Sequence, residues 1–115
     1  MKTIFIFILV SLFSIKLNAQ SSVTTTTLLV SGNCDECKER IENAADIKGV
    51  KICKWNPDTK IATLTFDSKK TTLNAIENAI ANAGYETSSH KANQKAYNNL
   101  PECCKYMQGA CIKKQ

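Results

Sequence analysis

The sequence lacks a large excess of charge, a long apolar run and more than one histidine. Its formal net charge is +5 and its basic residues are spread along the chain, so we expect no nucleic-acid partner. The most apolar run, from Ile4 to Phe13, is too short for a permanent membrane anchor. The only histidine, His90, lies near the expected end of a strand, and we expect a surface residue there rather than a metal ligand.

Residues 1–19 have the pattern of a secretory signal peptide. A basic start precedes the apolar run, and Ala19 precedes a polar stretch. We therefore expect cleavage after Ala19, export to the periplasm or the extracellular space, and no stable membrane anchor in the mature chain. Loss of Lys2 and Lys16 would lower the net charge from +5 to +3. The remaining residues 20–115 are enough for one small domain with a modest core.

Six cysteines follow the N-terminal segment, namely Cys34, Cys37, Cys53, Cys103, Cys104 and Cys111. An even number of cysteines in an exported chain favours a disulfide framework as the default interpretation. Their uneven spacing argues against one explanation for all of them, because they form a CxxC pair, a lone strand position and a C-terminal cluster.

The CxxC pair is predicted to lie at the junction of a strand and a helix. Cys34 and Cys37 follow a β-branched run that ends at Ser31, and an amphipathic helical pattern begins near Asp35. At a helix N-terminus, the positive end of the helix dipole and the unpaired N–H groups stabilise thiolate over thiol. Two such thiolates suit either soft-metal binding or thiol–disulfide exchange, and the spacing alone does not separate these functions.

Residues 23–90 show the order strand, helix, strand, strand, helix, strand. The expected elements are a strand from Val23 to Ser31, a helix from about Asp35 that ends before Lys48, two strands between Val50 and Asp67, a helix from Thr71 or Thr72 to Gly84, and a strand from Tyr85 to about His90. This order predicts an α+β fold, the ferredoxin-like βαββαβ sandwich, with both helices on one face of a four-stranded antiparallel sheet.

Residues 91–115 are expected to form a polar linker up to Asn99 and then a Cys-rich tail. Three cysteines lie in this tail: Cys103, Cys104 and Cys111. A disulfide would join the last of them to one of the adjacent pair, since adjacent cysteines bridge each other only with strain. The alternative is a second soft-metal site that uses these thiolates and the Met107 thioether. A flexible linker would also let the tail present an extra thiolate to a metal on the CxxC pair.

Four segments carry a resemblance to a known family, namely Gly32-Asn33-Cys34-Asp35-Glu36-Cys37, Gly49-Val50, Ala62-Thr63-Leu64-Thr65-Phe66-Asp67 and Ala83-Gly84-Tyr85. Together they resemble the heavy-metal-associated domain family, which includes soft-metal chaperones and the exported mercury-binding protein of mercury resistance. The resemblance implies such a domain over residues 20–90 and metal binding by Cys34 and Cys37. It also implies binding without turnover of a substrate, so we expect no enzymatic activity.

The resemblance assigns roles to two residues beside the pair. The aromatic residue after the second helix typically lies beside the metal in this family, which here is Tyr85. Asn33 stands where the family usually has a methionine that anchors the loop inward. We expect Asn33 to replace that apolar packing with side-chain hydrogen bonding to the turn.

The chemistry of the thiolate pair favours soft ions. Two thiolates can hold Cu(I) or Hg(II) in near-linear, two-coordinate geometry, whereas Zn(II) normally takes four ligands and suits the pair less well. An open two-ligand site also lets an incoming thiolate displace one ligand at a time. The expected partner is therefore a metal transporter or another thiol-bearing metal protein, and we expect the chain itself to be a monomer.

The alternative function is a thiol–disulfide oxidoreductase that uses the same CxxC pair. A thioredoxin-type fold would need a larger α/β layout and normally a proline that faces the active disulfide. The only prolines are Pro57, in an expected hairpin turn, and Pro101, in the tail.

For the lone strand cysteine, Cys53, we expect a structural role rather than metal binding or thiol chemistry. Cys53 shares a strand face with Trp55, and we expect it to act as a small hydrophobic residue. For Cys34 and Cys37 we expect the reverse, that neither thiol fills the core.

Overall fold

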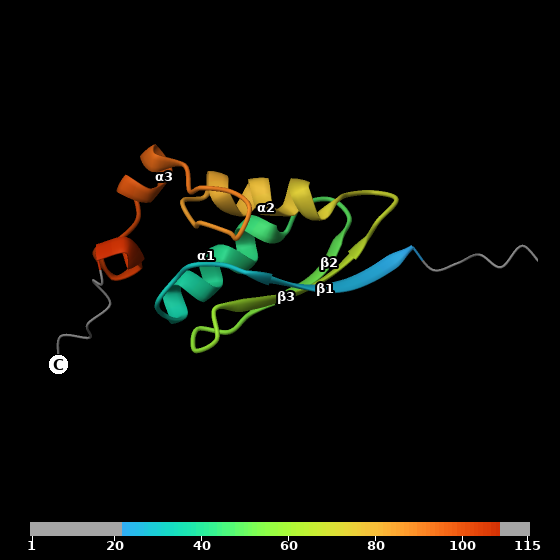
Figure 1. Cartoon of the computed structure of the whole chain (residues 1–115), viewed down its shortest axis with the longest axis horizontal. Helices are drawn as coiled ribbons and strands as arrows, with labels where there is room; N and C mark the ends of the chain where they lie inside the picture. Colours follow the sequence, from blue (N-terminus) through green and yellow to red (C-terminus); the bar gives the residue numbers. More distant parts are fainter. Residues whose placement is uncertain (1–21, 109–115) are drawn as a thin grey trace, which may run out of the picture.

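The computed structural model of the chain describes residues 22–108 (Figure 1), so the predicted signal peptide and Cys111 lie outside it. Its elements are β1 (Val23–Leu29), α1 (Asp35–Ala45), β2 (Val50–Trp55), β3 (Ile61–Asp67), α2 (Leu73–Asn82), α3 (Gln94–Asn98) and two 3-10 helices, η1 (Glu102–Cys104) and η2 (Tyr106–Gln108). Within this part of the chain, no helix has the length and apolarity that crossing a membrane requires.

The three strands form one antiparallel sheet in the order β1-β3-β2. β3 is the central strand, and its alternating pattern turns Ala62, Leu64 and Phe66 to the buried face. The fold class is therefore α+β, and the predicted hairpin of β2 and β3 is present.

The sequence predicts a fourth strand from Tyr85 to about His90, and the structure does not form it. This segment instead makes a single antiparallel bridge beside β1, between Val30 and Thr87. The Thr87 hydroxyl accepts a hydrogen bond from the His90 N–H at 3.1 Å, and the Thr87 N–H donates to the His90 carbonyl at 2.9 Å. These bonds close a turn, so the pairing with the edge of β1 stays limited to this bridge. The predicted fourth strand, and with it the complete ferredoxin-like βαββαβ topology, is not confirmed.

α1 and α2 lie on the same face of the sheet (Figure 1). The N-cap of α2 is Thr72, whose hydroxyl accepts a hydrogen bond from the Ala75 N–H at 3.1 Å. The chain turns away after α2 at Gly84, where a φ of +101° favours glycine. The core between helices and sheet contains Leu28, Val30, Ile41, Trp55, Leu64, Ile76, Ile80 and Tyr85.

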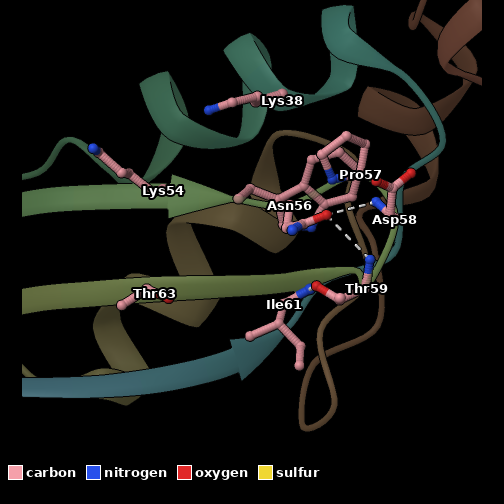
Figure 2. A pocket seen from close by; sticks show the side chains of 9 residues that line it. Lys38, Lys54, Asn56, Pro57, Asp58, Thr59, Ile61 and Thr63 are labelled. Carbon is pink, nitrogen blue, oxygen red and sulfur yellow. Dashed lines mark hydrogen bonds between the residues drawn. The ribbon is translucent and has the colours of Figure 1, made fainter.

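The side chain of Asn56 stabilises the turn between β2 and β3. Asn56 Oδ1 accepts hydrogen bonds from the backbone N–H groups of Asp58, at 2.8 Å, and Thr59, at 3.2 Å (Figure 2). Figure 2 also shows Lys38 of α1 and Lys54 of β2 at the open hollow beside this turn. The turn fixes the register of β2 against β3.

Residues 91–99, predicted to be a polar linker, contain the helix α3. Asn93 caps this helix with its side-chain oxygen, which accepts from the Ala96 N–H at 2.9 Å. Tyr97 and Leu100 are both buried in the core. A helix of five residues is too short for apolar periodicity to be visible in the sequence. The C-terminal segment is therefore packed against the domain, and the linker prediction was wrong.

Candidate metal centre

The loop that leads to the CxxC pair is positioned by Trp55. The indole N–H donates a hydrogen bond to the Val30 carbonyl at 3.0 Å. A Cβ atom at Gly32 would lie 3.0 Å from two atoms of this ring and 3.2 Å from Cδ1 of Ile41. Because glycine has no side chain, the loop can lie directly on the indole and deliver the next residues to the start of α1.

The structure brings Cys34 and Cys37 together at the start of α1. Cys34 is the N-cap residue, with extended backbone, and Cys37 lies in the first turn. Their Sγ atoms are 3.5 Å apart. Both sulfurs therefore lie at the N-terminal end of an eleven-residue helix.

The two thiols differ in exposure. Cys34 is partly exposed, whereas Cys37 is 0% exposed and packs in the core. The expectation that neither thiol fills the core was wrong for Cys37. It lies one turn before Ile41 on the buried stripe of α1, so the helix directs it toward the sheet. An ion or a partner's ligand can therefore approach the pair from the side of Cys34.

Asn33 contacts the pair directly. The Cys37 thiol donates a hydrogen bond to Asn33 Oδ1 at 3.0 Å. This bond joins the Asn33 side chain to a thiol, and the expected bonding of Asn33 to the turn stays a prediction. If Cys37 is ionised, a rotation of the amide by half a turn presents its NH₂ group to the thiolate instead.

A third sulfur belongs to the same cluster. Cys104, the last residue of η1, is 0% exposed, and its Sγ and those of Cys34 and Cys37 all lie within 4.8 Å of one another. Burial is the main cause that raises the pKa of Cys104, and the nearby Cys37 thiol adds to it. Figure 1 shows the C-terminal segment at the end of the domain where α1 begins.

Cys103 faces a different partner. Its thiol donates a hydrogen bond to Glu36 Oε2 at 2.7 Å, and this bond raises the pKa of Cys103. Its backbone carbonyl accepts a hydrogen bond from the Cys34 thiol at 3.4 Å. The Sγ atoms of Cys103 and Cys104 are 3.9 Å apart. No disulfide joins two cysteines within residues 22–108, and the predicted alternative of a bridge to Cys111 lies outside them.

Tyr85 lies against the buried side of the sulfur cluster. It is 0% exposed, and its hydroxyl has no hydrogen-bond partner among the residues that the structure describes. Burial is the largest cause that raises the pKa of Tyr85, and the nearby thiols of Cys104 and Cys37 contribute.

His90, Cys53 and Met107 lie outside the cluster of Cys34, Cys37 and Cys104. His90, expected at the surface, is partly buried with Nδ1 3.4 Å from Glu77 Oε2. Cys53 is partly buried on β2, where burial raises the pKa of its thiol to about 11, consistent with a small hydrophobic residue. The Met107 side chain is half exposed. The sequence did not predict that a folded segment, which contains α3 and η1, places Cys104 beside the CxxC pair.

Comparison with known protein families decides how this centre is classified. The family model of the heavy-metal-associated domain matches residues 27–86. The chain belongs to the heavy-metal-associated domain family. The matched range includes Cys34, Cys37 and Tyr85 but ends before α3, so Cys103 and Cys104 come from outside the family domain.

Individual relatives agree with this family. The mercuric transport protein periplasmic component of Shewanella putrefaciens is 40% identical over 80 residues, which cover 67% of this chain and 88% of that protein. The protein of the same name from Pseudomonas aeruginosa is 33% identical over 70 residues, covering 59% of this chain and 77% of that protein.

Solved structures of family members have the same fold. Oxidized MerP from Ralstonia metallidurans CH34 is 34% identical with a TM-score of 0.54, over 57% of this chain and 94% of that one. The CopZ metallochaperone is 27% identical with a TM-score of 0.54, over 56% of this chain and 98% of that one. About half of this chain thus corresponds to nearly the whole of each of those proteins.

Proposed function

We propose that the chain is an exported binding protein for a soft metal ion, Hg(II) or Cu(I), which it holds through Cys34 and Cys37. The observation that carries this proposal is the distance of 3.5 Å between the two sulfurs at the start of α1. Soft thiolates select soft ions, and two ligands satisfy Hg(II) or Cu(I) but leave Zn(II) short of its usual four. The names of the relatives support mercury and a periplasmic location, and that of CopZ supports copper.

The unequal exposure of the two thiols supports a role in relay. Cys37 is buried and holds its position, while Cys34 is partly exposed at the N-cap. A thiolate of a metal transporter, or of another thiol-bearing protein, can displace Cys34 first and Cys37 second. The ion is then never without ligands, and no substrate is converted.

The experiment is a competition titration of the reduced chain with Hg(II), and separately with Cu(I), against a soluble chelator. We expect one tightly bound ion in the original chain and loss of tight binding in the Cys34→Ser, Cys37→Ser double variant. The control is Cys53→Ser, which removes a partly buried thiol outside the cluster and should leave the affinity unchanged. Equal affinity of the double variant and the original chain would refute the proposal.

Because Cys37 packs in the core, loss of binding in the double variant could arise from unfolding. The Cys34→Ser single variant separates the two effects, since Cys34 is partly exposed. It should lose affinity while the circular dichroism spectrum and thermal midpoint stay close to those of the original chain.

A further inference from the structure

We propose that Cys104 supplies a third thiolate to the ion held by Cys34 and Cys37, so that the chain binds a soft divalent ion such as Hg(II) in a three-sulfur site. This inference rests on the proposed function of the CxxC pair and adds a ligand from outside the family domain. Two observations support it, the cluster of three sulfurs and the buried hydroxyl of Tyr85 beside it, which has no hydrogen-bond partner in the described part of the chain.

The distances among the three sulfurs suit one common ion. Since the sulfurs of Cys34, Cys37 and Cys104 lie within 4.8 Å of one another, some point lies no more than about 2.8 Å from each of them. Metal–thiolate bonds are about 2.3 Å for zinc and longer for larger soft ions. Small side-chain adjustments therefore complete three bonds without a rearrangement of the backbone.

Aromatic packing holds the segment that carries Cys104. Tyr106, two residues further along, stacks on Tyr85 with ring centroids 5.7 Å apart and ring planes at 19°. Tyr97 meets the edge of the Tyr106 ring, with centroids 5.2 Å apart and planes at 79°. Cys104 thus lies in the sequence between Tyr97 and Tyr106, whose rings are both packed. Its sulfur is therefore held at the cluster before any ion binds.

Hydrogen bonds fasten the same segment to the family domain. The Tyr106 hydroxyl donates to the Gly84 carbonyl at 2.8 Å and accepts from the Glu86 N–H at 2.9 Å. Gly84 also permits close contact with α3, because a Cβ there would lie 2.9 Å from the backbone nitrogen of Tyr97. The domain is therefore shaped to receive the C-terminal segment.

The Tyr85 hydroxyl provides a donor for a negatively charged cluster. A buried hydroxyl without a partner is unfavourable, and a thiolate is a much better acceptor than a thiol. On binding, each of three thiols releases its proton to solvent, so a divalent ion leaves a net charge of −1 and a monovalent ion −2. A hydrogen bond from Tyr85 and the positive end of the α1 dipole can offset a buried net charge of −1 more readily than one of −2. This difference favours the divalent ion.

The test is X-ray absorption spectroscopy of the reduced full chain loaded with one equivalent of Hg(II), in a sample that elutes as a monomer. We expect three sulfur neighbours around mercury in the original chain. Cys104→Ser should have two sulfur neighbours and lower affinity in the competition titration. Cys53→Ser, the matched control, should keep three.

Two further variants identify the source of the third sulfur. Cys103→Ser and Cys111→Ser should each keep three sulfur neighbours. A drop to two in either variant, with three retained in Cys104→Ser, would overturn the assignment to Cys104. If Cys104→Ser fails to fold, three sulfurs in the original chain and in the Cys53→Ser, Cys103→Ser, Cys111→Ser and Met107→Ala variants still assign the third ligand to Cys104 by elimination.

The outcomes also separate this inference from the proposed function. Two sulfur neighbours in the original chain, with tight binding that depends on Cys34 and Cys37, would overturn the three-sulfur site and leave the proposed function intact. If the original chain binds Hg(II) no more tightly than the Cys34→Ser, Cys37→Ser double variant does, both the three-sulfur site and the proposed function are overturned.

Discussion

Tyr106 stacks on Tyr85, the aromatic residue that lies against the sulfur cluster, with 5.7 Å between their ring centroids. The contact joins a segment outside the family domain to a residue inside it. The domain and its C-terminal segment therefore form one packed unit around the thiols, and we expect the stability of the segment and the geometry of the candidate metal centre to be coupled.

Replacement of Tyr106 by Phe should measure this coupling. The variant keeps the ring but leaves the Gly84 carbonyl and the Glu86 N–H without their partner. Loss of two partly buried hydrogen bonds should lower the free energy of unfolding by about 1–3 kcal/mol, as measured by urea denaturation. It should also weaken binding of Hg(II), because Cys104 is held less firmly.

The control for Tyr106→Phe is Met107→Ala, one residue further along the same segment. The Met107 side chain is half exposed, so its loss should change the free energy of unfolding by no more than about 0.5 kcal/mol. A stability of Tyr106→Phe equal to that of Met107→Ala would mean that the hydroxyl does not fasten the segment.

The elements of the family domain could be predicted because their signals are local. Thr72 is an N-cap, Gly84 has a positive φ, and Asn56 holds a turn, and each type of residue has a strong positional preference. The absent fourth strand depends on a competition between a ladder with β1 and the turn from Thr87 to His90. The composition of the segment does not reveal which of the two is more stable.

The arrangement of the candidate metal centre could be predicted only in part. The CxxC spacing and its place before a helix identify Cys34 and Cys37, but the burial of Cys37 depends on how α1 is rotated against the sheet. The position of Cys104 depends on ring contacts of Tyr97 and Tyr106, which join parts of the chain that are distant in sequence. Such contacts leave no periodic pattern in a short segment.

Gly32→Ala should destabilise the domain. The added methyl group would lie 3.0 Å from the Trp55 ring and 3.2 Å from Ile41 Cδ1, so the loop or the ring must move. We expect a loss of about 1–3 kcal/mol in the free energy of unfolding. Ile41→Val removes the Cδ1 atom, so the double variant should lose less than the sum of the two single losses. Strict additivity would argue against the contact with Ile41 and leave the Trp55 ring as the source of the clash.

The Cys53 thiol should make stability depend on alkaline pH. Burial raises its pKa from 9.0 to about 11, so the folded state binds more protons than the unfolded state between these values. Its stabilising contribution is therefore complete below about pH 9 and is lost as the pH rises to about 11. The stability of the original chain relative to Cys53→Ala should fall over this range in reducing urea titrations. A constant difference would contradict the raised pKa.

Oxidation should abolish metal uptake. The sulfurs of Cys34 and Cys37 are 3.5 Å apart, and an oxidant that removes two electrons and two protons would join them in a disulfide. A disulfide between Cys34 and Cys37 offers no thiolates, so the proposed three-sulfur site would lose two of its three ligands. Chelator competition should find little Hg(II) on the oxidised chain and full uptake after reduction. Equal uptake in both states would exclude redox control.

Asn33→Asp should weaken metal binding without loss of the fold. The Cys37 thiol lies 3.0 Å from Asn33 Oδ1, and a carboxylate of the same shape at this distance would repel a thiolate. Ionisation of Cys37, which metal binding requires, becomes less favourable, so the affinity for Hg(II) near neutral pH should fall by about tenfold or more. Competition titration measures this loss.

The matched control for Asn33→Asp is Asn56→Asp. It makes the same change in the β2–β3 turn, where the side-chain oxygen accepts two backbone hydrogen bonds that a carboxylate can also accept. It adds an identical charge to the chain but leaves the cluster untouched, so its affinity should stay at the original value. An equal loss in both variants would show that overall charge, rather than the contact between Asn33 and Cys37, governs binding.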